Sequence, residues 1–248
     1  MSVTIGNCTL LREINFRLDE PGLYFLVGPN GSGKSTLLKT LAGILPATQG
    51  RVHFKNRPLS SYASGSLSSL RAFLPQRESA CTEFSVQEAI FWGSYTVFQT
   101  NSRRHLEQIE KQIEQWGLRP HRICSTLSGG ERQRVRLAQV FAHCGTCPDL
   151  TLVLLDEPLQ SLDISFQKRV FDQMERWAER ALVLVALHDL YPACPSRRTL
   201  LINNGTLVAD EYRGPEEKLR EVFQISQGFL SCDTRDVGVG FSNDDPMA

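Results

Sequence analysis

Residues 28–36 read Gly28-Pro29-Asn30-Gly31-Ser32-Gly33-Lys34-Ser35-Thr36 and fit the phosphate-binding pattern G-x-x-x-x-G-K-[ST]. The stretch follows an apolar run at residues 23–27 and precedes a helical pattern at residues 37–42. Small residues let backbone N–H groups converge on phosphates, and the start of a helix adds a partial positive charge. We therefore predict that these nine residues bind a nucleoside triphosphate. Lys34 would reach the β- and γ-phosphates, and the Ser35 hydroxyl would bind Mg²⁺.

Composition and charge narrow the classes of partner. The 248 residues include 27 Lys and Arg against 27 Asp and Glu, so no overall field favours nucleic acid or an anionic membrane surface. No apolar run approaches the roughly 20 residues that a membrane-spanning helix needs. The N-terminus lacks the basic and apolar segments of a secretory signal. We expect a cytosolic chain that binds no nucleic acid and meets a membrane only through a partner.

Three apolar runs, at residues 24–27, 152–155 and 182–187, have the character of buried parallel strands. Each leads into a polar turn. Ligands of open α/β sheets bind outside the carboxyl ends of the strands, so we expect these turns to converge on one site. Residues 3–18 with 50–54 alternate enough to predict a small antiparallel sheet.

The middle of the chain is predicted to be helical. Residues 85–91 and 103–116 carry helical patterns, and Gly117 is placed to end the second helix. We interpret residues 77–145 as a helical insertion between catalytic strands, and residues 1–230 as one domain. The remaining residues 231–248 form a tail.

The second apolar run ends in two carboxylates, Asp156 and Glu157, followed by Pro158. At a strand end beside the phosphate-binding loop, Asp156 is suited to hold Mg²⁺ through water. Glu157 can face the γ-phosphate and act as the general base for the attacking water. An acidic cap at the start of a helix would explain either carboxylate alone, but the loop upstream favours the catalytic interpretation.

A further glycine turn, Ser128-Gly129-Gly130, precedes a helical pattern at residues 132–142. Alone it is a common helix start, although its free amides could receive an anion. With the phosphate-binding loop upstream and the acidic strand downstream, it makes the chain resemble the ATP-binding subunits of ABC transporters. The remaining motifs of that family follow in order: Gln76 matches the Q-loop glutamine, Ser161-Leu162-Asp163 the D-loop, and His188 the switch histidine.

The resemblance covers residues 3–228 and implies a fold, ligands and roles. The fold is a P-loop NTPase α/β core with an N-terminal antiparallel β subdomain and an inserted helical subdomain. The ligands are ATP and Mg²⁺. Gln76 and His188 join Glu157 as catalytic residues, and Gln76 also joins Ser35 and Asp156 at the metal. The three residues at 128–130 bind the nucleotide of a second copy in a head-to-tail homodimer.

The resemblance also implies partners. A chain without a membrane span acts with separate membrane subunits, here two copies of a polytopic permease, and indirectly with a periplasmic substrate-binding protein. Its place is then the cytoplasmic face of the inner membrane, as a peripheral protein. Phe84, Val86, Ile90 and Trp92 are candidates for the surface that faces the permease, unless the helix that carries them buries them in the core.

Motif details make the chain most similar to importer ATPases for vitamin B12, ferric siderophores and haem, and within that group to vitamin B12 importers. Siderophore or haem import remains an alternative, as does a soluble ABC ATPase of the iron–sulfur assembly type. One departure matters. The family places an aromatic residue about twenty positions before the loop to stack on adenine, whereas residues 5–9 contain none. The residue that contacts the base is therefore not identified by the sequence.

Overall fold

The central feature of the computed structural model is a six-stranded sheet in the order β10-β9-β3-β8-β7-β6. The structure describes residues 1–76, 83–94, 102–188, 197–212 and 222. Five neighbouring strands run parallel, and β10 lies antiparallel to β9 at one edge. The strands are β3 Gly22–Val27, β6 Arg71–Leu74, β7 Leu152–Asp156, β8 Leu182–Leu187, β9 Arg198–Asn203 and β10 Thr206–Tyr212. The three predicted buried strands are confirmed as β3, β7 and β8, and they are direct neighbours.

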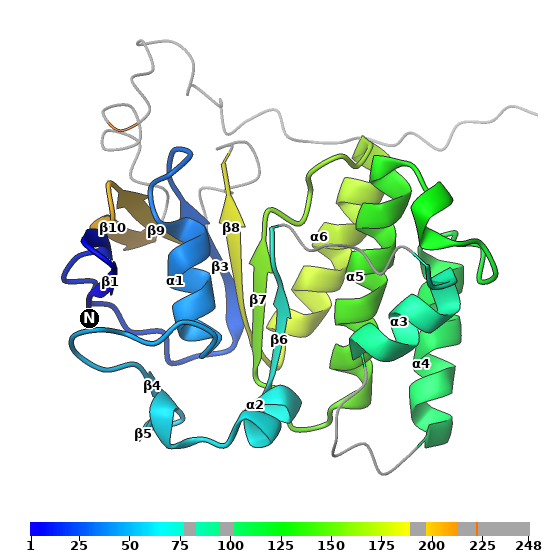
Figure 1. Ribbon diagram of the computed structural model, residues 1–248, viewed down its shortest axis with the longest axis horizontal. Coiled ribbons are helices and arrows are strands. Elements are labelled where there is room, and N and C mark those ends of the chain that lie inside the picture. Colours follow the sequence, from blue (N-terminus) through cyan, green and yellow to red (C-terminus); the bar gives the residue numbers. More distant parts are fainter. Residues whose placement is uncertain (77–82, 95–101, 189–196, 213–221, 223–248) are drawn as a thin grey trace, which may run out of the picture.

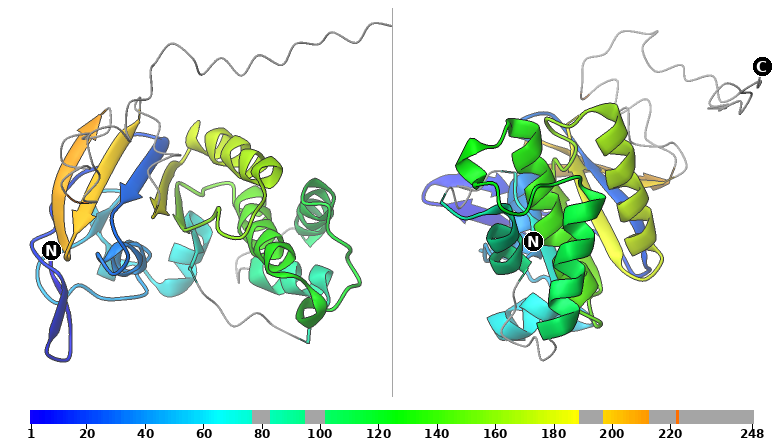
Figure 2. Two further views of the ribbon diagram at one scale, coloured as in Figure 1. Left: turned by 90° about the horizontal axis from the view of Figure 1, so that it is seen from above. Right: turned by 90° about the vertical axis from the view of Figure 1, so that its right-hand side faces the viewer.

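Helices cover both faces of this sheet (Figures 1 and 2). Successive residues of β3 alternate between two cores: Phe25 packs with the helices α5 and α6, and Leu26 packs with α1. A strand with both faces covered must be apolar at every position, and all residues of β7 are indeed buried. The helices are α1 Lys34–Leu41, α2 Ser64–Leu70, α3 Val86–Ser94, α4 Ser102–Gln115, α5 Gly129–Thr146 and α6 Ile164–Ala178, with short 3₁₀ turns at Leu59–Ser61 and Cys124–Thr126.

The predicted N-terminal antiparallel sheet is wrong in its extent. Two separate hairpins occur instead, β1 Val3–Ile5 with β2 Cys8–Leu11, and β4 His53–Phe54 with β5 Arg57–Pro58. The first hairpin ends early because Glu13 adopts a left-handed backbone conformation (φ 48°) and the next amide bonds to the carbonyl of Met1. A strand cannot continue through such a residue.

The predicted helices of the middle region are confirmed with small shifts. Helix α4 is followed by Gly117 with φ 57°, the left-handed conformation expected after a helix. Helices α3, α4 and α5 pack on one another beside the sheet (Figure 1). Residues 77–82 at the start of the predicted insertion, and the tail 231–248, lie outside the described residues.

The four candidates for a permease-facing surface divide into two pairs. Val86 and Ile90 are fully buried in the core shared with α5, so for them the surface interpretation is wrong. Phe84 is 39% exposed and Trp92 57% exposed. None of the described helices combines the length and the apolar character that spanning a membrane requires.

Candidate functional site

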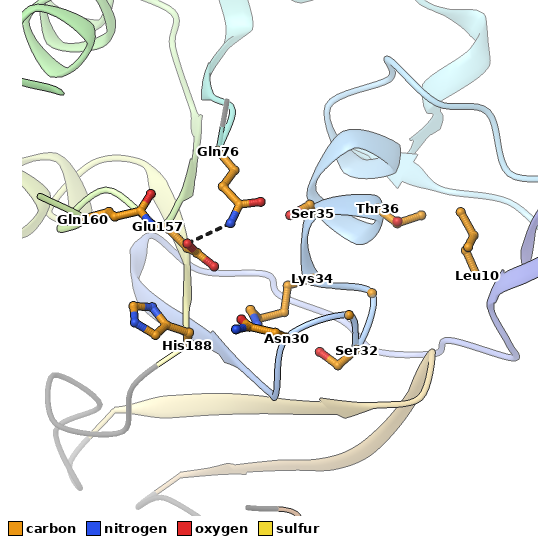
Figure 3. Close-up of a pocket in the computed structure, with 12 residues that line it drawn as sticks. Leu10, Asn30, Ser32, Lys34, Ser35, Thr36, Gln76, Glu157, Gln160 and His188 are labelled. Atoms are coloured by element: carbon orange, nitrogen blue, oxygen red, sulfur yellow. Dashed lines mark hydrogen bonds between the residues drawn. The ribbon is translucent and has the colours of Figure 1, made fainter. Parts of the chain in front are cut away.

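The ends of β3, β7 and β8 meet at a pocket of about 630 Å³ (Figure 3). The parallel register explains why: Val27 lies opposite Leu187, and Ala186 lies opposite Asp156, so the three strands end at the same level of the sheet. The residues that line the pocket are Leu10, Asn30, Gly31, Ser32, Gly33, Lys34, Ser35, Thr36, Gln76, Glu157, Gln160 and His188. The structure thus brings the predicted phosphate-binding loop together with all three predicted catalytic residues.

The phosphate-binding loop wraps around the Lys34 ammonium. Its Nζ donates hydrogen bonds to the carbonyl oxygens of Gly28 at 2.6 Å and Pro29 at 3.0 Å. Burial lowers the pKa of Lys34, while the nearby carboxylates of Glu157 and Asp156 act in the opposite direction. A buried cation hydrogen-bonded to neutral carbonyls in a loop of amides is well placed to bind anionic phosphate oxygens.

At two positions of the loop only glycine fits, because a Cβ atom would clash with neighbouring residues. A Cβ on Gly28 would lie 2.1 Å from the carbonyl oxygen of Ile202 on β9. Gly33, which precedes α1, has φ 108°, and a Cβ there would approach a methyl of Leu11 to 2.8 Å. The loop is therefore seated directly against β9 and β2, and side chains at these positions would push it out of place.

Asp156 is 1% exposed and lies next to the pocket without lining it. Neither of its carboxylate oxygens has a hydrogen-bond partner among the described residues. Burial raises its pKa and Glu157 adds to the rise; the Ser35 hydroxyl, near the carboxylate but outside bonding geometry, lowers it, as do Lys34 and Lys39. A buried carboxylate without a donor is costly unless a cation compensates it. The arrangement of Asp156 and Ser35 therefore fits a magnesium ion.

Glu157 lines the pocket directly after β7. Its backbone has φ 51°, a conformation that is uncommon for a residue with a side chain. The backbone N–H bonds to the Ala186 carbonyl at 3.0 Å, and the Oε2 atom accepts a hydrogen bond from Gln76 Nε2 at 2.8 Å. The uncommon backbone conformation aims the carboxylate of the buried Glu157 at the pocket (Figure 3).

His188 follows β8 directly and lines the same wall as an exposed side chain. Two further lining residues were missed by sequence reasoning, Leu10 and Gln160. Gln160 lies three residues after Glu157, a spacing that was available as a signal. Leu10 lies on β2, at the end of the pocket beyond Thr36 and away from Glu157 (Figure 3). It puts an apolar side chain at the end of the pocket opposite the predicted catalytic residues.

The structure does not bring Ser128-Gly129-Gly130 to this pocket. Ser128 caps α5: its Oγ accepts the Glu131 amide at 3.2 Å, while its own N–H donates to Glu131 Oε2 at 2.8 Å. Ser128 and Gly129 are exposed. A Cβ on Gly130 would come within 2.8 Å of the Ser161 carbonyl oxygen. The turn therefore presents the N-terminus of an 18-residue helix to the outside of this chain.

Comparisons with known proteins agree on one family. A model of the ABC transporter family matches residues 11–160. A hemin import ATP-binding protein of Hahella chejuensis (strain KCTC 2396) is 37% identical over 242 residues, which cover 93% of each chain. A protein of the same name from Rhodopseudomonas palustris (strain BisB18) is 35% identical over 248 residues, covering 97% of this chain and 91% of its own.

Solved structures share the fold at low identity. The ATP-binding subunit of an ABC transporter matches with a TM-score of 0.75 at 20% identity, covering 90% of each chain. A dimeric, post-hydrolysis structure of the ATP-binding cassette MJ0796 with ADP and phosphate has a TM-score of 0.72 at 21% identity, covering 86% of this chain and 96% of its own.

The phosphate-binding role of the loop can be tested through its lysine. Lys34→Ala removes the buried cation of the loop and leaves the nearby carboxylates of Glu157 and Asp156 uncompensated, so ATP binding should weaken by at least about 100-fold, as expected when a buried charge loses its partner. Lys39→Ala on the exposed face of the same helix is the matched control and should bind ATP as the parent does. Equilibrium dialysis with ATP measures both; parental affinity in Lys34→Ala would contradict the assignment.

Proposed function

Because the chain belongs to the ABC transporter family and is an ATPase, we propose that it is the subunit that powers haem import through a separate membrane permease. The observation that carries the catalytic part is the pocket in which a phosphate-binding loop faces the hydrogen-bonded pair Gln76–Glu157. The cargo part rests on relatives at 35–37% identity that are named for hemin import.

The cargo differs from the one that motif details favoured. Sequence motifs suggested vitamin B12, whereas the relatives described above carry the name of the haem alternative. The pocket does not distinguish between the cargoes, because its lining residues would contact the nucleotide and not the cargo. Cargo choice in this arrangement lies with the permease and the periplasmic binding protein, which the ATPase serves from the cytoplasmic face of the inner membrane.

Hydrolysis requires the phosphates to be held and their charge compensated. Residues 28–36 would bind the phosphates through backbone amides, with Lys34 exchanging its carbonyl partners for phosphate oxygens. Asp156 through water, together with Ser35 and Gln76, would hold Mg²⁺, which neutralises charge that develops on the phosphates. The orphaned, buried carboxylate of Asp156 supports this assignment.

Glu157 is the proposed general base. Its carboxylate lines the pocket and accepts a hydrogen bond from Gln76 at Oε2, and the other oxygen would accept a proton from water. Gln76 is then the residue that orients Glu157 and the water together. His188, on the same wall, would contact the γ-phosphate.

We propose a dimer because the pocket of a single chain does not include the Ser128-Gly129-Gly130 turn. Ser128-Gly129-Gly130 forms the N-terminus of α5, is exposed at Ser128 and Gly129, and does not line the pocket of its own chain. A second copy in a head-to-tail arrangement would place this turn over the nucleotide, where the helix dipole favours phosphate. ATP would then favour the closed dimer because only closure satisfies both sets of donors.

The permease would contact the surface of α3 near Gln76. Trp92 on α3 and Phe84 just before this helix are large, substantially exposed apolar side chains, and exposed apolar groups of this size are typical of interaction sites. A siderophore permease would meet the same surface, and a soluble iron–sulfur assembly ATPase would not need it. Co-purification with a polytopic membrane protein supports transport over the soluble alternative.

The general base is tested by Glu157→Gln. The amide keeps the shape and the bond to Gln76 but cannot take a proton, so ATP hydrolysis should fall by roughly 10²–10⁴-fold. Nucleotide binding should persist, and the variant should accumulate as an ATP-bound dimer of doubled mass in size-exclusion chromatography. Asp156→Asn should instead fail to form this dimer with ATP and Mg²⁺. Hydrolysis by Glu157→Gln at the parental rate would show that another group is the base.

The shared site is tested by mixing two inactive variants. Ser128→Arg blocks the turn that serves the partner's nucleotide, and Lys34→Ala disables the chain's own loop. A head-to-tail heterodimer combines both defects in one site and leaves the second site intact. Mixing should therefore restore ATPase activity, measured as phosphate release. Because Ser128 also caps α5, thermal melting must first show that its variant is folded. If mixing restores no ATPase activity, the dimer does not contain two independent sites that are each shared between the two chains.

The cargo is tested in proteoliposomes that contain this chain and the permease that co-purifies with it. We expect ATP-dependent accumulation of hemin delivered by the cognate periplasmic binding protein, and none of cyanocobalamin. The same vesicles with the Glu157→Gln variant serve as the control without turnover. Uptake of cyanocobalamin or of a ferric siderophore in place of hemin would overturn the cargo while leaving the ATPase mechanism unaffected.

A further inference from the structure

Two side chains of α5, Gln133 and Arg136, contact the backbone beside both catalytic residues. The Arg136 guanidinium donates through Nη1 to the Gln76 carbonyl at 3.2 Å and through Nη2 to the Pro75 carbonyl. Gln133 donates through Nε2 to the Pro158 carbonyl at 3.0 Å. Gln133 is 6% exposed and Arg136 is half-buried. These contacts join a helix to segments 25 to 61 residues away in sequence.

The contacts close a ring around the proposed chemistry. Gln133 and Arg136 lie three residues apart, on one face of the helix, and are linked by a 3.0 Å hydrogen bond from Arg136 Nη1 to Gln133 Oε1. Pro158 directly follows Glu157. From Gln76 the ring passes through its 2.8 Å bond to Glu157, and from Pro158 it returns through Gln133 and Arg136. One turn of one helix therefore contacts both of the loops that carry the proposed catalytic residues Gln76 and Glu157.

A purely structural explanation would be that Arg136 satisfies carbonyls left over where β6 ends. The ladder between β6 and β7 ends at Leu74 opposite Leu155, so Pro75 and Gln76 lie beyond the sheet. Any donor could fill that need. The Arg136 guanidinium bonds to two successive carbonyls at once. Unlike a donor to a single carbonyl, it thereby fixes the orientation of the peptide that carries the Gln76 side chain. Arg136 also lies eight residues, or about 12 Å along a rigid helix, from the exposed cap at Ser128.

We propose that Arg136, braced by Gln133, is a positioning residue that holds Gln76 in register with Glu157, so that α5 connects the Ser128 turn to the catalytic pair. The proposal rests on the function proposed above for Gln76. It implies that Arg136 affects the rate of hydrolysis rather than the binding of nucleotide, because the guanidinium reaches the backbone of Gln76 and does not line the pocket.

The test separates rate from binding. Arg136→Ala should lower kcat for ATP by about tenfold and leave KM within about twofold. Arg136→Lys keeps a cation that can bond to one of the two carbonyls but not to both at once. Its kcat should therefore lie between those of the parent and of Arg136→Ala. The matched control is Arg134→Ala on the same helix: Arg134 also donates to a carbonyl, that of Trp116 at 2.9 Å, but touches neither catalytic loop. It should keep the parental kcat.

A double-mutant cycle shows whether Arg136 acts through Gln76. In a Gln76→Ala background the substitution Arg136→Ala should lower kcat no further, because the positioned side chain is already absent. Effects that multiply, or a change confined to KM, would overturn the proposal. If Arg136→Ala melts below the assay temperature, Arg136→Lys in the same cycle decides: a parental kcat overturns the proposal, and a reduced kcat that is not additive with Gln76→Ala supports it.

Failure of this inference is distinguishable from failure of the proposed function. A parental kcat in Gln76→Ala contradicts the catalytic role of Gln76 itself. A reduced kcat in Gln76→Ala together with a parental kcat in Arg136→Ala contradicts only the positioning role. A loss of activity in Arg134→Ala as large as in Arg136→Ala would show that α5 needs its carbonyl contacts for packing alone.

Discussion

The parallel pairing of β3, β8 and β7 is the constraint on which the site depends. Asp156 lies opposite Ala186, and Leu187 lies opposite Val27, so the three chains leave the sheet at one level. A shift of one residue in β7 would turn Asp156 to the other face and move Glu157 away from the loop. Both faces of the sheet are buried under helices, and this burial holds the register against such a slip.

The pocket combines groups that oppose one another electrostatically. A buried lysine and two buried carboxylates lie close together, and burial opposes the charge on both Lys34 and Asp156. The carboxylate of Asp156 has no hydrogen-bond donor among the described residues, and the ammonium of Lys34 is hydrogen-bonded to neutral carbonyl oxygens. A phosphate chain with a magnesium ion would supply a partner for each of them. The site is therefore preorganised for a charged ligand at a cost in stability of the free protein.

Helix α5 connects the exposed turn at Ser128, the pocket wall and the neighbouring helices α3 and α4. Its first turn is exposed at Ser128, its second contacts the backbone beside Gln76 and Glu157, and its remainder packs on α3 and α4. The candidate permease surface at Trp92 lies on α3, which packs on this helix. One rigid element thus links the proposed dimer contact, the catalytic pair and the proposed membrane partner.

From apolar runs and motif spacing, the sequence by itself predicted the α/β core, its three central strands, the loop at residues 28–36 and Glu157 as a candidate base. Gln76 and His188 were added by the resemblance to the ABC family, and both line the same pocket as Glu157. The sequence misjudged the N-terminal sheet, since the left-handed turn at Glu13 has no strong local signature. Only the tertiary structure decided that Val86 is core and Trp92 exposed, that Leu10 lines the pocket, that Ser128 lies away from it, and that Arg136 holds Gln76. Each of these depends on contacts between segments distant in sequence, where packing and register, rather than local propensity, determine which side chains meet.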